Sequence, residues 1–240
     1  MHCIAIVQAR MSSSRLPGKV MKKLCGVPMI QHIVDRLKLC AYVDKIVVAT
    51  SDEISDDILA EYCKRNRITI YRGSLNNVFS RFINLIDLYQ PSYVVRITGD
   101  CPLIYPLFID KQIKALNESD SDIVITSYES KLLCGQGVHS ARSLKYIFRN
   151  SSDTRDLEHV GSIYLSNNPN QFQSVCLNLP PLFAKNFRIT VDEICDFQLM
   201  ENLYSELFKG KTINFQEAIY WLENNKKDSQ LNEAVKDSQI

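Results

Sequence analysis

Short apolar runs alternate with helical segments through the first half of this chain, and this rhythm limits the possible folds more than any single motif. Five runs have the length and composition of strands: residues 3–7, 45–50, 68–71, 92–98 and 122–126. Between them apolar residues recur at helical spacing, for example at 29, 30, 33, 34 and 37. Strands that alternate with helices form βαβ units around a parallel sheet. The rhythm therefore predicts an α/β fold with a mainly parallel sheet.

The first apolar run leads into a basic, hydroxyl-rich loop. Residues 8–19 read QARMSSSRLPGK, and no acidic residue appears before Asp35. Ligands of open α/β sheets bind beyond the carboxyl ends of the strands, where Arg, Lys and hydroxyl groups can bind phosphate oxygens. The loop is neither a Walker loop, because Val20 follows Gly18-Lys19, nor a G-x-G-x-x-G fingerprint. Composition alone leaves two interpretations open, an anion site and an ordinary surface loop with solvated cations.

Two acidic residues each follow a predicted strand. Asp100 comes after the run 92–98, and Asp192 comes after a short run at 187–191 that we also predict to be a strand. Right-handed crossovers would place the basic loop and the loop at Asp100 on the same rim of the sheet. Carboxylates held there suit Mg²⁺, which prefers oxygen ligands. The alternative is that both residues are turn or helix-cap residues.

Three segments resemble the sugar-acid cytidylyltransferases, and in particular their spore-coat-polysaccharide-type branch. They are the loop 8–19, RITGDCPLI at 96–104 and RITVD at 188–192. The family also includes the 3-deoxy-manno-octulosonate and acylneuraminate cytidylyltransferases, and the resemblance extends to about Leu222. It implies a Rossmann-like three-layer α/β/α fold of the nucleotide-diphospho-sugar transferase type.

The resemblance also implies an activity. It assigns the two magnesium-binding acids to Asp100 and Asp192, and triphosphate contacts to Arg10, Arg15 and Lys19. Arg10, Lys19 and Asp100 are the expected catalytic residues. The expected enzyme is a Mg²⁺-dependent cytidylyltransferase that couples CTP to a sugar acid, releases pyrophosphate and supplies surface polysaccharide or glycan synthesis. Such a reaction depends on positioning and charge neutralisation more than on covalent catalysis.

The remaining site predictions concern the nucleotide and the acceptor. The predicted nucleotide-binding residues are Gln8, Ala9, Arg10, Ser14, Arg15, Lys19, Arg72, Arg81 and Thr98. Arg96, Glu158 and His159 are predicted to bind the acceptor, and Glu158-His159-Val160 resembles a motif of the same branch. Thr98 stands where the octulosonate enzymes have Gln, so the choice of CTP is open. Two routes for deprotonating the acceptor remain open: His159 as a general base, or activation of the hydroxyl by the metal.

Composition sets the domain organisation. With 240 residues and 45% hydrophobic content, we predict one nucleotidyltransferase domain at 1–222, with an irregular acceptor or dimer region at 133–182 and a polar, fraying C-terminal tail at 223–240. With a net charge of +1, the chain has no overall positive potential that would attract nucleic acid or a membrane surface. The eight Cys form no C-x-x-C pair, which favours a reduced, cytoplasmic protein. The expected partners are CTP, a small sugar acid and a second copy in a homodimer.

The irregular region carries local predictions of its own. Residues 135–138 are expected to be a turn-rich connection, 153–165 one helix and 172–179 a strand.

Three other functions remain open: transfer with another nucleotide or a small non-sugar acceptor, glycosyl transfer with a D-x-D metal site at Asp120-Ser121-Asp122, and a non-catalytic nucleotide-binding scaffold.

Overall fold

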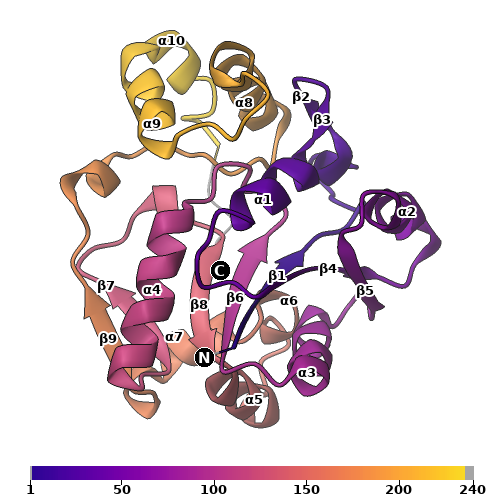
Figure 1. Cartoon of the computed structure of the whole chain (residues 1–240), viewed down its shortest axis with the longest axis vertical. Helices are drawn as coiled ribbons and strands as arrows, with labels where there is room; N and C mark the ends of the chain where they lie inside the picture. The colour runs from indigo at the N-terminus through magenta and orange to yellow at the C-terminus, as the bar shows by residue number, and fades with distance from the viewer. Residues whose placement is uncertain (1, 236–240) are drawn as a thin grey trace.

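The computed structural model describes residues 2–235, and within them seven strands form one central sheet. The strands are β1 (Cys3–Gln8), β4 (Lys45–Ser51), β5 (Thr69–Gly73), β6 (Tyr93–Thr98), β7 (Ile123–Thr126), β8 (Gln136–Ser140) and β9 (Ser174–Leu177). Their spatial order is β5-β4-β1-β6-β8-β7-β9, and β8 is antiparallel to both of its neighbours (Figure 1). The other neighbouring pairs are parallel. The prediction of a mainly parallel α/β sheet is confirmed.

Strand β1 lies at the centre of this arrangement. Residues Cys3 to Val7 are fully buried, as expected for a strand that is covered on both faces. The chain adds β4 and then β5 on one side of β1 and crosses to β6 on the other side. Gln8, the last residue of β1, is paired with Ala49 of β4 and Thr98 of β6. Because ligands of open α/β sheets bind where the strand order reverses, the carboxyl ends of β1 and β6 mark the expected site.

Helices cover both faces of the sheet. One face packs against α1 (Met29–Leu37), α2 (Asp57–Arg65) and α4 (Pro106–Ser119). The other packs against α3 (Val78–Tyr89), α5 (Ala141–Asn150) and the short α6 (Asp156–His159) and α7 (Ser162–Asn167). This confirms the three-layer α/β/α prediction. A small antiparallel pair, β2 (Lys23–Leu24) and β3 (Val27–Pro28), precedes α1.

Three further helices form a separate cluster at the top of Figure 1: α8 (Ile194–Leu207), α9 (Phe215–Asn224) and α10 (Lys226–Ser229). Phe215 of α9 stacks on Tyr105 with ring centroids 4.4 Å apart. The prediction that the chain frays from residue 224 is wrong for residues 225–235, because α10 forms there and Asn232 is buried. The last part of the predicted tail, 236–240, lies outside the described residues.

Two predictions for the irregular region are wrong. Residues 136–138, predicted as part of a turn-rich connection, belong to β8, and only Gly135 before them adopts the turn conformation, with φ +73°. The helix predicted at 153–165 is two short helices, because the chain takes positive φ at Val160 and Gly161. A Cβ on Gly161 would lie 2.5 Å from Ile147, so the chain passes too close to α5 for a larger residue.

Two predicted strands also differ from the structure. The strand predicted at 172–179 is limited to β9. Residues 187–191 form no strand, although Ile189 and Val191 are buried. The segment is extended and its backbone is tied to the loop after β6, because Val191 N donates to Asp100 O at 2.8 Å. This contact still brings Asp192 beside Asp100.

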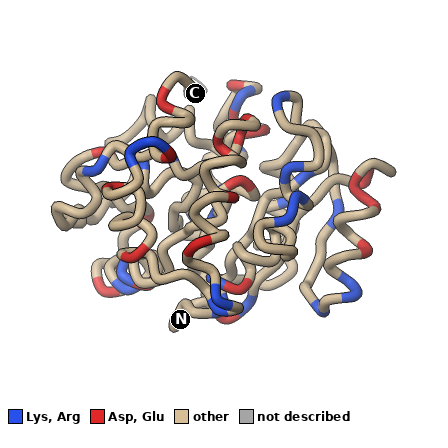
Figure 2. The backbone as a smooth tube through the Cα atoms, turned by 90° about the horizontal axis from the view of Figure 1, so that it is seen from above, with Lys and Arg blue, Asp and Glu red and all other residues tan. Residues whose placement is uncertain are grey.

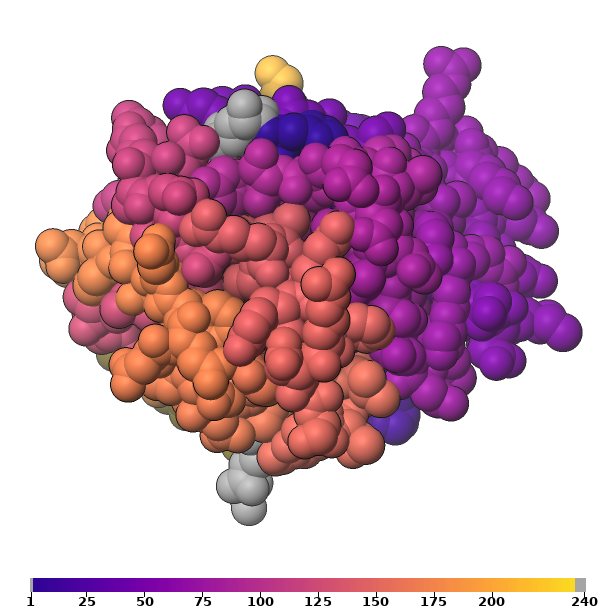
Figure 3. Space-filling view, turned by 90° about the horizontal axis from the view of Figure 1, so that it is seen from below, coloured from indigo at the N-terminus to yellow at the C-terminus, as the bar shows by residue number. Residues whose placement is uncertain are grey.

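Charged residues of both signs are spread along the described chain. Figure 2 shows basic and acidic residues interspersed along the backbone, in keeping with a net charge of +1. Figure 3 shows the salmon-to-orange part of the chain as one continuous area beside the purple segment that includes α3. In residues 2–235 no helix is both long and apolar enough to cross a membrane.

Candidate active site

The basic loop is fixed over the carboxyl ends of the central strands. Ala9 N donates to Ala49 O at 3.1 Å, and Met11 N donates to Asp56 Oδ1 at 2.6 Å. Asp56 is fully buried and also accepts from the Thr50 hydroxyl at 2.8 Å. Burial opposes its charge, but the hydrogen bonds from Ser51 and Met11 prevail and lower the pKa of Asp56. The loop is therefore anchored by a buried carboxylate. Asp56 was not predicted, because its partner Met11 N is a backbone group distant in sequence.

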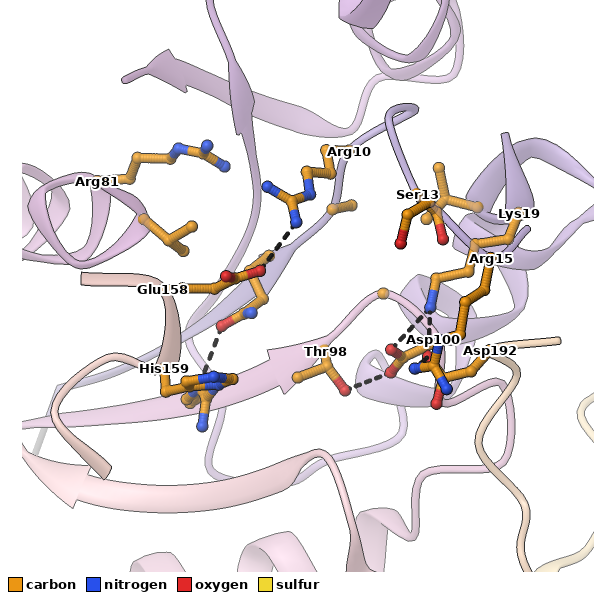
Figure 4. A pocket seen from close by; sticks show the side chains of 17 residues that line it. Arg10, Ser13, Arg15, Lys19, Arg81, Thr98, Asp100, Glu158, His159 and Asp192 are labelled. Atoms are coloured by element: carbon orange, nitrogen blue, oxygen red, sulfur yellow. Dashed lines mark hydrogen bonds and ion pairs between the residues drawn. The ribbon is translucent and has the colours of Figure 1, made fainter. Parts of the chain in front are cut away.

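A pocket of about 290 Å³ opens beneath this loop (Figure 4). Every predicted site residue except Arg72 lines it: Gln8, Ala9, Arg10, Ser14, Arg15, Lys19, Arg81, Arg96, Thr98, Asp100, Glu158, His159 and Asp192. Four lining residues were not predicted: Ser13, Val20, Val78 and Gly99. The pocket has two ends, which we name the carboxylate end (Arg15, Lys19, Asp100 and Asp192) and the α6 end (Arg96, Glu158 and His159).

Lys19 connects the two acids of the carboxylate end. Its Nζ lies 3.0 Å from Asp100 Oδ2 and 2.9 Å from Asp192 Oδ1. Burial opposes the charge on Lys19, but the two carboxylates outweigh it and raise the pKa of the ammonium. Burial likewise opposes the charge on Asp100, and Lys19 and Thr98 nevertheless lower the pKa of this carboxyl. Lys19 and Asp100 are therefore both charged at neutral pH.

Asp100 has a second support on β6. The Thr98 hydroxyl donates to Asp100 Oδ1 at 2.5 Å. Gly135 approaches from the start of β8, and a Cβ there would lie 2.3 Å from both Thr98 Oγ1 and Cys101 Sγ. The single hydroxyl proton of Thr98 is therefore directed to Asp100. Recognition of the base by Thr98, which stays a prediction, would have to use its oxygen as an acceptor.

Asp192 is held by residues that the sequence analysis did not identify. Arg188 Nη2 donates to Asp192 Oδ2 at 2.5 Å, and Arg188 Nε donates to Asp196 Oδ1 at 3.0 Å. The other oxygen of Asp196 accepts from the backbone N of Asp192 at 2.9 Å. Arg188 belongs to the RITVD motif, but the strand predicted at 187–191 gives no sign that its guanidinium reaches the carboxylates four and eight residues later. Arg15 completes the surroundings with Nη2 3.2 Å from Asp192 Oδ1.

The α6 end is more open. Arg10 Nη2 pairs with Glu158 Oε1 at 2.8 Å, and the two side chains are 37% and 54% exposed. Arg96 lies deeper, where its Nε donates to Gln8 Oε1 at 3.0 Å and burial lowers the pKa of its guanidinium. His159 ends α6 beside Glu158. Together with Arg10, this end offers guanidinium donors, a carboxylate acceptor and an imidazole to a polar ligand.

Two predicted arginines have other partners. Arg81 is almost fully buried at the wall of the pocket and donates to the backbone oxygens of Ser74 and Leu75 at 2.8 and 3.2 Å. The structure does not bring Arg72 into the pocket. Arg72 lies on the edge strand β5, and its guanidinium binds Ser51 O at 2.9 Å and Asp57 at 2.6 Å. Arg72 is therefore not among the residues that line the pocket, and its contact with the nucleotide stays a prediction.

The carboxylate end fits a divalent cation that is shared with a phosphate. Asp100 and Asp192 both direct an oxygen at one cationic atom, Lys19 Nζ. No group of three His, Cys, Asp or Glu residues within 2–235 forms a potential metal cage. Mg²⁺ is commonly held by one or two carboxylates together with substrate phosphates and water. The two carboxylates match that arrangement if a bound phosphate supplies further ligands.

Comparisons with known proteins agree with this geometry. Residues 4–237 match the family described as cytidylyltransferase. The chain is 31% identical over 225 residues to the spore coat polysaccharide biosynthesis protein SpsF of Bacillus subtilis (strain 168), covering 92% of this chain and 93% of the relative. It is also 30% identical over 134 residues to the 3-deoxy-manno-octulosonate cytidylyltransferase of Pelobacter propionicus, covering 56% of this chain and 51% of that protein.

Solved structures support the same fold. A cytidylyltransferase from Leptospira borgpetersenii superposes with a TM-score of 0.87 at 24% identity, covering 99% of this chain and 100% of that one. The CMP:2-keto-3-deoxy-manno-octonic acid synthetase complexed with CTP superposes with a TM-score of 0.61 at 15% identity, covering 86% and 99% of the two chains. From the match over residues 4–237 and the relative of nearly equal length, this chain belongs to the cytidylyltransferase family.

Proposed function

We propose that this protein couples CTP to a sugar acid in a Mg²⁺-dependent reaction that yields a CMP-activated sugar and pyrophosphate. The observation that carries the proposal is the convergence of Lys19, Asp100 and Asp192 beneath the basic loop. The relatives add support, since one is named for spore coat polysaccharide biosynthesis and another for transfer to 3-deoxy-manno-octulosonate.

In the proposed reaction, a hydroxyl oxygen of the acceptor forms a bond to the α-phosphorus of CTP. The bond between the α-phosphorus and the bridging oxygen breaks, pyrophosphate leaves with that electron pair, and the hydroxyl proton passes to a base or to water. Negative charge builds up on the leaving pyrophosphate. Lys19, Arg15 and Arg10 line the pocket where they can neutralise it, which is the main demand of such transfers.

Mg²⁺, when bound between Asp100 and Asp192, would supply further neutralisation of the triphosphate. Lys19 is the cation between the two carboxylates in this structure. Arg188 binds Asp192 Oδ2, which leaves Oδ1 directed toward Lys19. These contacts orient both carboxylates before a nucleotide arrives.

The acceptor would bind at the α6 end. A sugar acid carries a carboxylate and several hydroxyl groups, and Arg96, Glu158 and His159 offer a cation, an acceptor and an imidazole. His159 lines the pocket, where its imidazole would contact the acceptor. The same residues would also suit a small polar acceptor of another kind, so the acceptor has to be identified by assay.

The proposal is tested by incubating the protein with CTP, Mg²⁺ and a panel of nonulosonic, octulosonic and phosphonic acids while measuring pyrophosphate release. Release that requires CTP, Mg²⁺ and one class of acid is the expected result. A calorimetric comparison of the four nucleoside triphosphates checks the base preference. The proposal would be contradicted if no acid of the panel supported pyrophosphate release, or if all four triphosphates bound equally well.

One specific observation favours a broader nucleotide preference as the second candidate. Arg72 is outside the pocket and the Thr98 hydroxyl proton is directed to Asp100, so neither of these two predicted side chains supplies a donor to the base. Recognition would then depend on backbone groups around Gln8 and Ala9. The glycosyltransferase alternative has no comparable support, because Asp120 and Asp122 bind Arg142 and do not line the pocket. The homodimer remains part of the proposal, to be checked by light scattering.

A further inference from the structure

The chain beyond α9 returns to the carboxylate end of the pocket. Asn232 is only 2% exposed, although Leu231, Glu233 and Ala234 beside it are exposed. Its Nδ2 donates to the backbone oxygen of Arg188 at 3.1 Å and to Asp196 Oδ1 at 2.8 Å. A buried amide that makes two donated hydrogen bonds is held in one orientation. The C-terminal segment therefore contacts the two residues that fix Asp192.

These contacts form a short chain that leads to the proposed metal ligand. Asp196 is fully buried, and its Oδ1 accepts from both Asn232 and Arg188 Nε. Arg188 in turn donates to Asp192 Oδ2 at 2.5 Å. Asp192 Oδ1 is then the oxygen that lies 2.9 Å from Lys19 Nζ. Asn232 thus acts on the position of Asp192 through Asp196 and Arg188 without touching the pocket.

A second contact holds the same segment without involving these residues. Asn202 on α8 donates its Nδ2 to Asp228 Oδ1 of α10 at 2.7 Å. Loss of that bond would loosen α10 but would leave Asp196 and Arg188 with their partners. The two asparagines therefore separate a general tethering role from an effect on Asp192.

We infer that Asn232, in the C-terminal segment 225–235, is a positioning residue for Asp192. The inference rests on the proposed function, because it assigns Asp192 to the metal. Without the amide of Asn232, Asp196 Oδ1 keeps Arg188 as its donor and the Arg188 carbonyl loses a partner, so the guanidinium can shift. Loss of such outer partners commonly weakens metal binding by about 10- to 100-fold.

The test compares wild type, Asn232→Ala and Asn202→Ala with Mn²⁺ as a paramagnetic probe. Mn²⁺ affinity in the presence of CTP is measured by electron paramagnetic resonance, CTP affinity without metal by calorimetry in EDTA, and folding by thermal melts. We expect Asn232→Ala to weaken Mn²⁺ binding at least about tenfold while CTP binding in EDTA stays within about twofold. Asn202→Ala should leave Mn²⁺ affinity unchanged even where it lowers the melting temperature.

Unchanged Mn²⁺ affinity in Asn232→Ala, or an equal loss in Asn202→Ala, would overturn the inference while leaving the proposed function intact. If wild type itself bound no Mn²⁺ with CTP, the proposed function would fail and the inference with it. Should Asn232→Ala not fold, Arg188→Lys provides the second route, because it keeps the charge but loses the fork that joins Asp192 to Asp196. It should weaken Mn²⁺ binding as strongly, and normal Mn²⁺ binding by folded Arg188→Lys would also overturn the inference.

Discussion

The two ends of the pocket are built in different ways. At the carboxylate end, the side chains of Lys19, Asp192 and Asp100 are 12%, 18% and 22% exposed, and each has at least two polar partners. At the α6 end, Arg10 and Glu158 are 37% and 54% exposed and pair with each other. Ion pairs that are shielded from solvent are geometrically constrained, whereas exposed pairs contribute little to stability. The carboxylate end is therefore preorganised before a ligand binds, whereas the side chains of the α6 end can move on binding.

This contrast assigns chemistry and specificity to different ends. Stabilising a developing charge requires groups that are already in place, since reorganisation would cost part of their effect. Selecting an acceptor can tolerate side chains that move on binding. We expect changes at the carboxylate end to lower turnover strongly and changes at the α6 end to alter acceptor affinity more mildly.

The largest effect is expected for Asp100→Asn. The substitution removes a charge that holds Lys19 and, in the proposed function, a metal ligand that supplies several kcal/mol of charge stabilisation. Turnover measured by pyrophosphate release should fall about 10³-fold, which corresponds to roughly 4 kcal/mol. Asp120→Asn is the matched control, since Asp120 is exposed and lies outside the pocket. Wild-type turnover in Asp100→Asn would contradict the assignment of the chemistry to the carboxylate end.

Lys19→Met should have the next largest effect. A charge-assisted contact contributes about 1.5–3 kcal/mol, so its loss should lower kcat/KM for CTP by about tenfold to a hundredfold. Lys38→Met provides the control, because Lys38 is exposed and pairs only locally with Asp35. If the two lysine variants lowered kcat/KM equally, the preorganised ammonium would have no special role.

Glu158→Gln should produce a smaller and differently distributed effect. The exposed pair with Arg10 is worth at most about 1 kcal/mol, so the KM for CTP should rise less than about fivefold. The KM for the acceptor should rise more than that, because the proposed acceptor contact is lost. Steady-state kinetics with each substrate varied in turn measures both values, with Glu61→Gln as an exposed control. A rise in the KM for CTP that exceeds the rise in the KM for the acceptor would contradict the separate roles of the two ends.

The smallest effect on binding is expected for Arg72→Met. Arg72 belongs to neither end, and its contacts join β5 to the loop after β4. Calorimetry should give a CTP affinity within about twofold of wild type, while thermal melts show a lower midpoint because several hydrogen bonds are lost. A loss of CTP affinity without loss of stability would return Arg72 to the binding site.

The residues of the carboxylate end can be predicted from the sequence, whereas the residues that hold them in place cannot. Apolar runs such as Cys3–Val7 are visible because a strand covered on both faces excludes polar residues. The basic loop and both acids follow strands or extended segments, so their meeting could be predicted from topology. Asp56 and Asn232 could not be assigned, because their partners are distant in sequence or are backbone atoms. Arg188 lies only four residues before Asp192, but the strand predicted at 187–191 would have kept the two side chains apart. The position of Arg72 outside the pocket could not be predicted either, because a strand position does not reveal which partner a long side chain finds.

The errors in the second half have a related cause. β8 begins directly after a glycine turn and contains a second glycine, so its local pattern resembles a loop, and only its pairing with β6 makes it a strand. The segment 187–191 has the opposite pattern, since it is apolar like a strand but has no strand partner in the described chain. In both cases tertiary contacts override local preference.

The central claim is that the carboxylate end holds one divalent cation together with a triphosphate. Anomalous X-ray diffraction from crystals grown with Mn²⁺ and a non-hydrolysable CTP analogue tests it most directly. We predict a Mn²⁺ peak between Asp100 and Asp192 that also contacts the phosphates, with Lys19 and Arg15 on the same triphosphate. A bound nucleotide whose Mn²⁺ lies away from both carboxylates would contradict the account.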